Sequence, residues 1–240
     1  MGCRQLFPAK AIYRLPPATD SRQGHVLRHA AGPEKLSMRI AITGSHSLGK
    51  STLVHQWVET HGNYRREEDP YRALGLHGPY EIRFREASTR LQNGIQLYYC
   101  ISRVHRYANS DETVIFDRSP VDYLAYSQYT ANQGKTDIDQ SFIESMLPAV
   151  RESLDHLDIL AFVPKSERWP VAMEADGIRP VDHAYRDDVD AIFKQIYRDG
   201  LFAVMPSHKA PLLVELWGPP NQRIDQLELA VAQRQQLDGV

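Results

Sequence analysis

Gly44-Ser-His-Ser-Leu-Gly-Lys-Ser51 decides the fold of this chain. The octapeptide matches the pattern G-x-x-x-x-G-K-S, whose glycines let the backbone turn tightly and aim its N–H groups at an anion. A mostly apolar run at 38–43 precedes it and predicts a buried strand, and residues 50–60 can form the helix that follows. The free N–H groups at the start of that helix also attract negative charge. The stretch therefore predicts a phosphate-binding loop (P-loop).

Each residue type in this loop has an expected role. Lys50 would reach the β- and γ-phosphates of a nucleoside triphosphate, and the hydroxyl of Ser51 would ligate Mg²⁺. A chance match is uncommon because glycine makes up only about 7% of average sequence, and the flanking strand and helix make it less common still. We expect ATP and Mg²⁺ as cofactors. The P-loop residues expected to contact the nucleotide are Gly44, Ser45, His46, Ser47, Leu48, Gly49, Lys50, Ser51 and Thr52.

Size and composition narrow the class of protein. The 240 residues suffice for one α/β domain with tails, and the formal net charge of −2 argues against a protein that coats nucleic acid. No apolar run approaches the roughly 20 residues needed to cross a bilayer. The two cysteines have no metal-binding spacing, so a reducing compartment is the default. We therefore expect a cytoplasmic protein that does not bind a membrane.

The first 37 residues differ from the rest. They hold four prolines and several arginines and have no sustained apolar period, so we expect residues 1–37 to be a disordered extension. An upstream start codon would explain such an extension, and a transit peptide is the alternative. The compact domain is expected to span 38–240.

Strands and helices alternate along this domain. Apolar runs predict strands at 38–43, 64–67, 113–116, 159–163 and 212–216. Amphipathic periods predict helices at 50–60, 80–109, 120–133, 137–157, 185–204 and 221–236. Such alternation is typical of a mainly parallel sheet with helices on both faces.

A second motif, Asp117-Arg118-Ser119, follows the third predicted strand. An acid at the carboxyl end of an apolar strand is where a Mg²⁺-organising aspartate belongs. The next residue, Arg118, cannot act as a base for water, but it can stabilise negative charge on a phosphoryl group. This favours transfer to a bound acceptor over hydrolysis. An ion pair at the protein surface is the alternative interpretation.

A third motif, Glu67-Glu68-Asp69-Pro70, follows the second predicted strand. A carboxylate there could accept the proton of an acceptor hydroxyl and orient its oxygen. Any one of the three acids could have this role, and Glu68 is the first choice. A solvated charged turn is the alternative.

The irregular stretch after the fourth predicted strand is rich in cations and has Gly177 and Pro180 within it. A loop at this place can close over bound phosphates and exclude water. We expect a lid at about 165–186, with Arg168 and Arg179 the arginines that contact phosphate. An ordinary basic loop is the alternative.

These motifs together resemble the P-loop nucleoside and nucleotide kinases, and in particular small "AAA domain" proteins similar to the ribosylnicotinamide kinase domain. The resemblance covers about residues 38–220. It implies a five-stranded parallel sheet in the order 2-3-1-4-5. Asp117-Arg118-Ser119 is similar to the acid-Arg-Ser motif of deoxynucleoside kinases, in which the acid supports Mg²⁺ and the arginine contacts the acceptor. By the same resemblance, the loop containing Pro219 borders the adenine, and Glu68-Asp69-Pro70 is similar to a Glu-Pro element with an extra residue.

We therefore expect a kinase that transfers the γ-phosphoryl group of ATP to a nucleoside, nucleotide or related small molecule. A P-loop ATPase or GTPase acting as a switch on a protein partner is the alternative. A nucleic-acid end kinase is disfavoured, because no basic stretch is studded with aromatic residues, and a homodimer is left open. Helix residues that face the acceptor pocket are expected to set specificity, and the candidates are Arg85, Gln92, Gln96 or Tyr99.

Overall fold

The computed structural model describes residues 37–76, 82–173 and 181–238. Within them, five parallel strands form one sheet in the order β2-β3-β1-β4-β5. This order confirms the predicted P-loop fold class. The strands are β1 (Arg39–Thr43), β2 (Tyr64–Glu67), β3 (Thr113–Asp117), β4 (Ile159–Phe162) and β5 (Leu212–Glu215).

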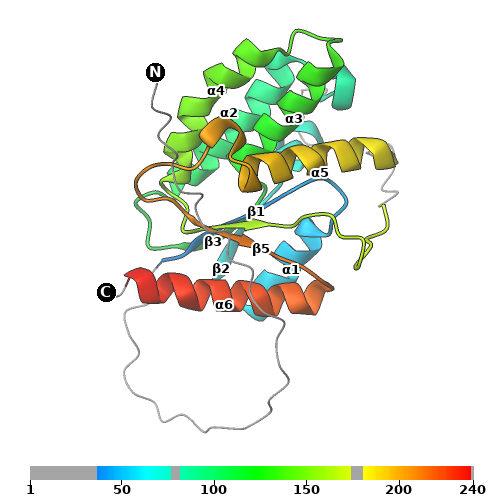
Figure 1. The fold of residues 1–240 in the computed structure, drawn as a ribbon. Helices are drawn as coiled ribbons and strands as arrows, with labels where there is room; N and C mark the ends of the chain where they lie inside the picture. The colour runs from blue at the N-terminus through cyan, green and yellow to red at the C-terminus, as the bar shows by residue number, and fades with distance from the viewer. Residues whose placement is uncertain (1–36, 77–81, 174–180, 239–240) are drawn as a thin grey trace, which may run out of the picture.

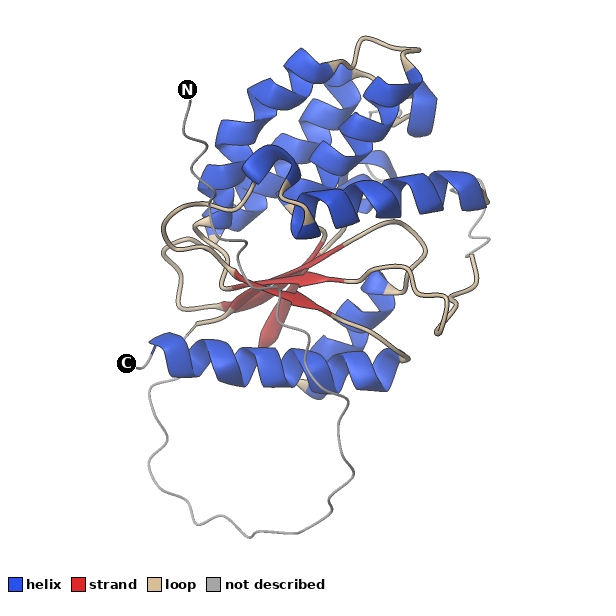
Figure 2. Ribbon diagram, viewed as in Figure 1, coloured by secondary structure: helices blue, strands red, loops and turns tan. Residues whose placement is uncertain are grey.

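Helices cover both faces of the sheet (Figure 2). One face carries α1 (Lys50–Thr60) and α6 (Pro220–Asp238), and the opposite face carries a larger group of helices (Figure 1). Each face buries its own apolar cluster against the sheet, because successive strand residues point to opposite faces. The larger group consists of α2 (Arg90–Arg106), α3 (Pro120–Gln133), α4 (Gln140–Leu154) and α5 (His183–Arg198).

The central strand β1 positions the site. It pairs with β3 on one side and β4 on the other, and Ile42 is in register with Asp117. The carboxyl ends of all five strands therefore meet at one edge, where ligands bind in open parallel sheets. The P-loop leaves β1 at this edge and leads into α1.

The helix predicted at 80–109 is shorter in the structure. It begins at Arg90 because Thr89 forms a capping box, in which its hydroxyl accepts from the N–H of Gln92 while the Gln92 side chain accepts from the N–H of Thr89. The residues before it include a turn of 3₁₀ helix, Arg85–Ala87, and residues 77–81 lie outside the described residues. The prediction that the helix already includes Phe84 and Ala87 was thus wrong, and Phe84 lines the pocket described below.

Caps also set the limits of the helix predicted at 185–204. α5 begins at His183, because the side chain of Asp182 accepts from the N–H of Tyr185 at 3.1 Å. It ends at Arg198, two residues before Gly200, which has a φ of 77°. Leu201–Ala203 form a separate 3₁₀ turn.

Two other expectations concern segments that are only partly described. All but the last residue of the expected extension 1–37 lies outside the described residues, as do residues 174–180 of the expected lid. None of the described helices has the length and apolar character needed to cross a membrane.

Candidate active site

The P-loop is held tightly against the sheet. Gly44 has a φ of 133°, and a Cβ at this position would lie 2.6 Å from the carbonyl oxygen of Val163, after β4. Only glycine fits so close an approach. Gly49 has a φ of 79° and forms the N-cap of α1, so the loop turns directly into the helix. Lys50 is buried, and its Nζ donates to the carbonyl of Ser45 within the same loop.

Ser51 and Asp117, the two predicted metal ligands, are neighbours in the structure. Asp117 ends β3 and is buried. Burial and the nearby carboxylate of Asp69 raise its pKa, while Arg118 and a hydrogen bond from Ser51 oppose the rise. Its Oδ1 is buried and, among the described residues, has no hydrogen-bond partner. A buried carboxylate oxygen and an adjacent hydroxyl are the oxygen ligands that Mg²⁺ prefers, so the residues present fit this ion.

Arg118 is the most connected side chain of the site. Its Nη1 lies 3.3 Å from the carbonyl oxygen of Gly44, 3.0 Å from Oδ2 of Asp122 and 2.7 Å from the hydroxyl of Tyr126. Its Nε donates to Oδ2 of Asp69 at 3.1 Å. The guanidinium therefore joins the P-loop, α3 and the segment after β2 in one network. Its Nη2 makes no hydrogen bond to the residues that the structure describes, and the side chain lines a pocket.

The backbone at Arg118 is strained. Its φ is 106°, in a region that residues with side chains rarely adopt. Such strain costs about 1–3 kcal/mol and persists where surrounding contacts enforce it. Here the N–H of Arg118 donates to the carbonyl of Ile42 at 3.1 Å, and the side chain is fixed by the four partners above. The conformation directs the guanidinium into the site.

The structure separates the three acids at the end of β2, of which Glu67 is the last residue of the strand. Glu67 is buried in a structural cluster with Arg103 and Tyr107. Glu68, the predicted substrate residue, is exposed and lies 3.5 Å from Arg66 on the surface. Asp69 is buried, pairs with Arg118 and lines the pocket. Successive strand residues face opposite sides of a sheet. The sequence alone does not show where β2 ends, and so it does not show which of these acids faces the site. Asp69 is thus the acid of this motif at the site.

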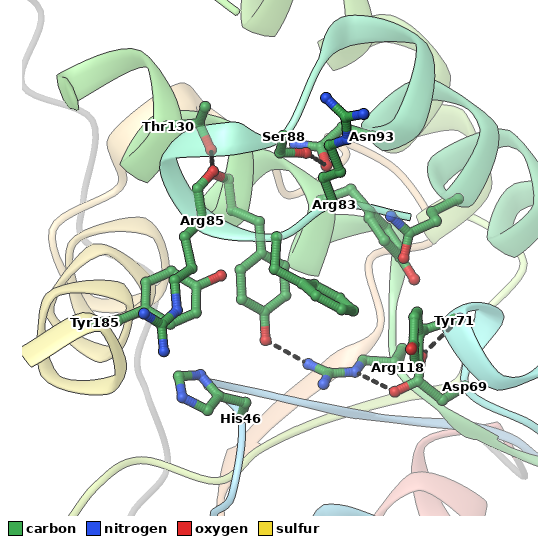
Figure 3. A pocket seen from close by; sticks show the side chains of 14 residues that line it. His46, Asp69, Tyr71, Arg83, Arg85, Ser88, Asn93, Arg118, Thr130 and Tyr185 are labelled. Carbon is green, nitrogen blue, oxygen red and sulfur yellow. Dashed lines mark hydrogen bonds and ion pairs between the residues drawn. The ribbon is translucent and has the colours of Figure 1, made fainter. Parts of the chain in front are cut away.

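A pocket adjoins the P-loop, and the space in it, open solvent included, is about 630 Å³. Figure 3 shows His46 of the P-loop at one side of its lower end, and Arg118 with Asp69 at the other. Aromatic rings form much of the wall, and Tyr71 and Phe84 lie 4.7 Å apart between ring centroids. The remaining lining residues are Arg83, Arg85, Ser88, Asn93, Gln96, Tyr123, Tyr126, Thr130 and Tyr185.

Two of the four helix residues predicted to set specificity line this pocket. Gln96 is buried and lines the pocket, and its Nε2 donates to the carbonyl of Gln92 at 3.2 Å. Arg85 lies 2.9 Å from Asp182 and over the ring of Tyr185. Gln92 and Tyr99 are not among the lining residues.

A second pocket lies between the P-loop helix and the start of α6. Its lining brings together Gly49 and Thr52 of the P-loop helix, Arg168 of the predicted lid, and Pro219 of the loop after β5. Arg168 is exposed, with its guanidinium 4.7 Å from the ring centre of Trp169. Four of the residues predicted to contact the nucleotide therefore border one space. Arg179, the other predicted lid arginine, lies outside the described residues.

Sequence reasoning missed several polar residues of the site. Asp122 accepts from the hydroxyl of Thr43 at 2.6 Å and from Arg118, and so fixes α3 against the P-loop strand. The carbonyl of Arg186 accepts from the hydroxyl of Ser45 at 2.9 Å. Arg223 reaches the P-loop from α6. An acid four residues after Arg118 was a visible helix spacing, but no local pattern places Arg186 or Arg223 beside the P-loop.

The chain matches a protein-family model described as an AAA domain over residues 39–211, which is most of the fold from β1 to the residue before β5. No curated protein matches it in sequence.

Solved structures share the fold. NadR protein in complex with NAD and AMP-PNP matches with a TM-score of 0.53 and 16% identity over 83% of this chain and 49% of that chain. NadR with NR matches with a TM-score of 0.57, 16% identity, and coverage of 83% and 52%. Deoxyadenosine kinase from M. mycoides with bound dATP matches with a TM-score of 0.57 and 14% identity over 81% of this chain and all of that one. This chain spans about half the length of the NadR chains. At such identities the likeness establishes the fold alone.

Proposed function

The chain belongs to the AAA domain family and has the fold of P-loop nucleoside kinases, and from this premise we propose that it is an ATP-dependent kinase of a small molecule. The acceptor would be a nucleoside, a nucleotide or a related metabolite. Two pockets beside one P-loop support the proposal. Gly49, Thr52, Arg168 and Pro219 line one of them, and the Arg118–Asp69 pair lines the other. A kinase needs two such sites that meet at the γ-phosphate.

The observation that carries the proposal is the Arg118–Asp69 pair at the P-loop end of the aromatic pocket. A hydrolase requires a group that activates water, whereas an acceptor hydroxyl needs a carboxylate that takes its proton. Asp69 has a buried carboxylate within the pocket lining, and Arg118 beside it carries positive charge. This arrangement suits transfer to a bound hydroxyl.

In the proposed reaction, the acceptor oxygen attacks the γ-phosphorus of ATP. The bond between the γ-phosphorus and the β,γ-bridging oxygen breaks, ADP leaves, and the acceptor proton passes to Asp69. Lys50 and the P-loop amides hold the β- and γ-phosphates, and Arg118 stabilises negative charge on the group in transfer. Catalysis would then consist of positioning and charge stabilisation.

Ser51 and Asp117 would hold Mg²⁺. When bound, this ion neutralises charge on the phosphate oxygens. The buried, unpartnered Oδ1 of Asp117 is the observation that supports a cation there. Arg168 and Pro219 would border the base of the nucleotide, and Arg179 remains a proposed lid residue.

The lining of the acceptor pocket favours a planar, partly polar molecule. Tyr71, Phe84 and Tyr126 offer ring faces, and flat ring systems pack well on such walls. Gln96 adds an amide whose carbonyl oxygen makes no hydrogen bond within the described part of the chain. A nucleoside, which combines a flat base with hydroxyl groups, satisfies both features. The structures with a similar fold include a NadR protein in complex with NR and a deoxyadenosine kinase with bound dATP.

The experiment is incubation of the protein with Mg²⁺ and ATP and a pool of nucleosides, nucleotides and nicotinamide riboside, with products identified by mass spectrometry. A phosphorylated member of the pool that is absent with Lys50→Ala would support the kinase. ATP binding with no phosphorylated product, together with nucleotide-dependent capture of a protein partner, would favour the switch alternative.

A further inference from the structure

Arg223 is a buried arginine on α6 whose side chain contacts the P-loop. Its exposed fraction is 4%, and its Nη1 donates to the carbonyl of Leu48 at 2.6 Å. A Cβ on Gly49 would lie 3.3 Å from the same nitrogen, so the guanidinium is packed directly against the end of the loop. Figure 1 shows the start of α6 at the same end of the molecule as α1.

This arginine is buried without a negative partner. Within residues 37–76, 82–173 and 181–238, no carboxylate forms an ion pair with Arg223, and its buried Nε has no hydrogen-bond partner. Burial alone lowers its pKa. An arginine in a protein nevertheless stays protonated at neutral pH, so the side chain holds an uncompensated charge. Such a charge is unfavourable until an anion pairs with it.

Arg223 lines two neighbouring pockets, and these indicate where an anion could pair with its guanidinium. The guanidinium lines the pocket that contains Gly49, Thr52 and Pro219. It also lines a neighbouring cavity with Leu48 and Arg186, whose Nε is likewise buried and unpartnered among the described residues. Arg186 Nε lies 3.7 Å from Oδ1 of Asp187. Two arginines with unused donors thus flank one P-loop residue.

We propose that Arg223 is a nucleotide-binding residue that contacts the polyphosphate chain beside the P-loop, and that this chain is its missing counter-ion. The inference rests on the proposed function for the identity of the ligand, which is the triphosphate of ATP. It adds that α6, and not only the P-loop and lid, provides positive charge to the nucleotide. Binding requires no phosphoryl transfer, so it can be tested separately from the kinase activity.

The test compares wild type with Arg223→Met by calorimetric titration with ATP, inorganic tripolyphosphate and adenosine, and by thermal unfolding without ligand. Methionine has a similar volume and no charge. We expect Arg223→Met to bind ATP and tripolyphosphate roughly tenfold or more weakly, as for loss of a charged hydrogen bond. The affinity for adenosine should be unchanged. The thermal unfolding midpoint of the ligand-free protein should be unchanged or higher. The matched control is Arg234→Met, about three turns further along α6.

Equal tripolyphosphate affinity in wild type and Arg223→Met would overturn the inference. A lower ligand-free midpoint with equal losses for adenosine and tripolyphosphate would also overturn it, because it would mean that Arg223 only supports the loop. If Arg223→Met does not fold, Arg223→Lys and Arg223→Gln replace it. The lysine variant should retain more tripolyphosphate affinity than the glutamine variant, and equal affinities would contradict the proposal.

Two failures are distinguishable in this design. Wild type that binds neither ATP nor tripolyphosphate would contradict the proposed function itself. Wild type that binds both, with no effect at position 223, would contradict only the role of Arg223.

Discussion

The Nε of Arg118 lies 3.1 Å from Oδ2 of Asp69, and both side chains are at least nine-tenths buried. The arginine follows β3 and the aspartate follows β2, and these strands are neighbours in the sheet. Their pairing brings a cation and a carboxylate to the same end of the aromatic pocket, beside the P-loop. The proposed chemistry depends on this pair, and four predictions follow from it and from its surroundings.

Replacement of Arg118 by alanine should lower turnover about 100-fold or more while leaving the KM for ATP nearly unchanged. The reason is that Arg118 stabilises charge that develops on the transferred group. The variant should also lose about 3–5 kcal/mol of stability, because Asp69 and Asp122 would be left buried without their cation. Steady-state kinetics and thermal unfolding measure the two effects. Unchanged turnover in a folded variant would remove Arg118 from the mechanism.

Asp69 and Glu68 form a matched pair for testing the proton acceptor. Asp69→Asn should reduce transfer about 100-fold or more, since an amide cannot take the hydroxyl proton. Glu68→Gln should retain nearly wild-type turnover, because the exposed Glu68 carboxylate pairs with Arg66 on the surface of the described part of the chain. Turnover numbers with saturating acceptor give the comparison. The reverse ranking would return the role to Glu68.

Replacement of Asp117 by asparagine should abolish most transfer yet stabilise the ligand-free protein, by about 1 kcal/mol at neutral pH. Burial raises the pKa of Asp117, so its ionised form is disfavoured in the folded state. A carboxyl whose pKa is higher in the folded state than in the unfolded state stabilises the fold fully when the pH is below the pKa of the unfolded state. This stabilisation is lost as the pH rises through the pKa of the folded state. The stability difference between Asp117→Asn and wild type should therefore shrink as the pH is lowered toward 4. A difference that grows at low pH would contradict this assignment.

Gly44→Ala should destabilise the protein by about 1–3 kcal/mol and weaken nucleotide binding. The new Cβ would lie 2.6 Å from the Val163 oxygen, at a φ of 133°. The control is Gly94→Ala in α2, where a Cβ meets no atom within 4 Å. That change should stabilise the protein by about 0.5–1 kcal/mol. Denaturant unfolding compares the two variants, and a stable, fully binding Gly44→Ala would show that the close approach is unimportant.

The fold could be predicted from sequence because its determinants are local. The P-loop octapeptide forces a strand, a turn and a helix in that order, and the alternation of apolar runs gives the rest of the parallel sheet. The order β2-β3-β1-β4-β5 came from the resemblance to P-loop kinases, and the structure confirms it.

The site was less predictable because its contacts span distant segments. Asp117 and Ser51 could be paired in advance, since both follow strands that end at the same sheet edge. Glu68 and Asp69 could not be separated, because one residue of register decides which of them faces the pocket. The helix start at Arg90 depended on the capping box at Thr89, which the apolar period concealed. Arg223 lies 175 positions from Leu48, whose carbonyl it contacts, and no sequence pattern indicates such a contact.

The most direct measurement follows the labelled γ-phosphoryl group of ATP in the presence of Mg²⁺. It compares wild type with Lys50→Ala, each with and without an acceptor. We expect wild type to place the label on the acceptor in proportion to the ADP formed, and to release little free phosphate when no acceptor is present. We expect Lys50→Ala neither to label the acceptor nor to release phosphate. Label released only as free phosphate, at a rate that acceptors do not change, would contradict the kinase and support a nucleotide-hydrolysing switch.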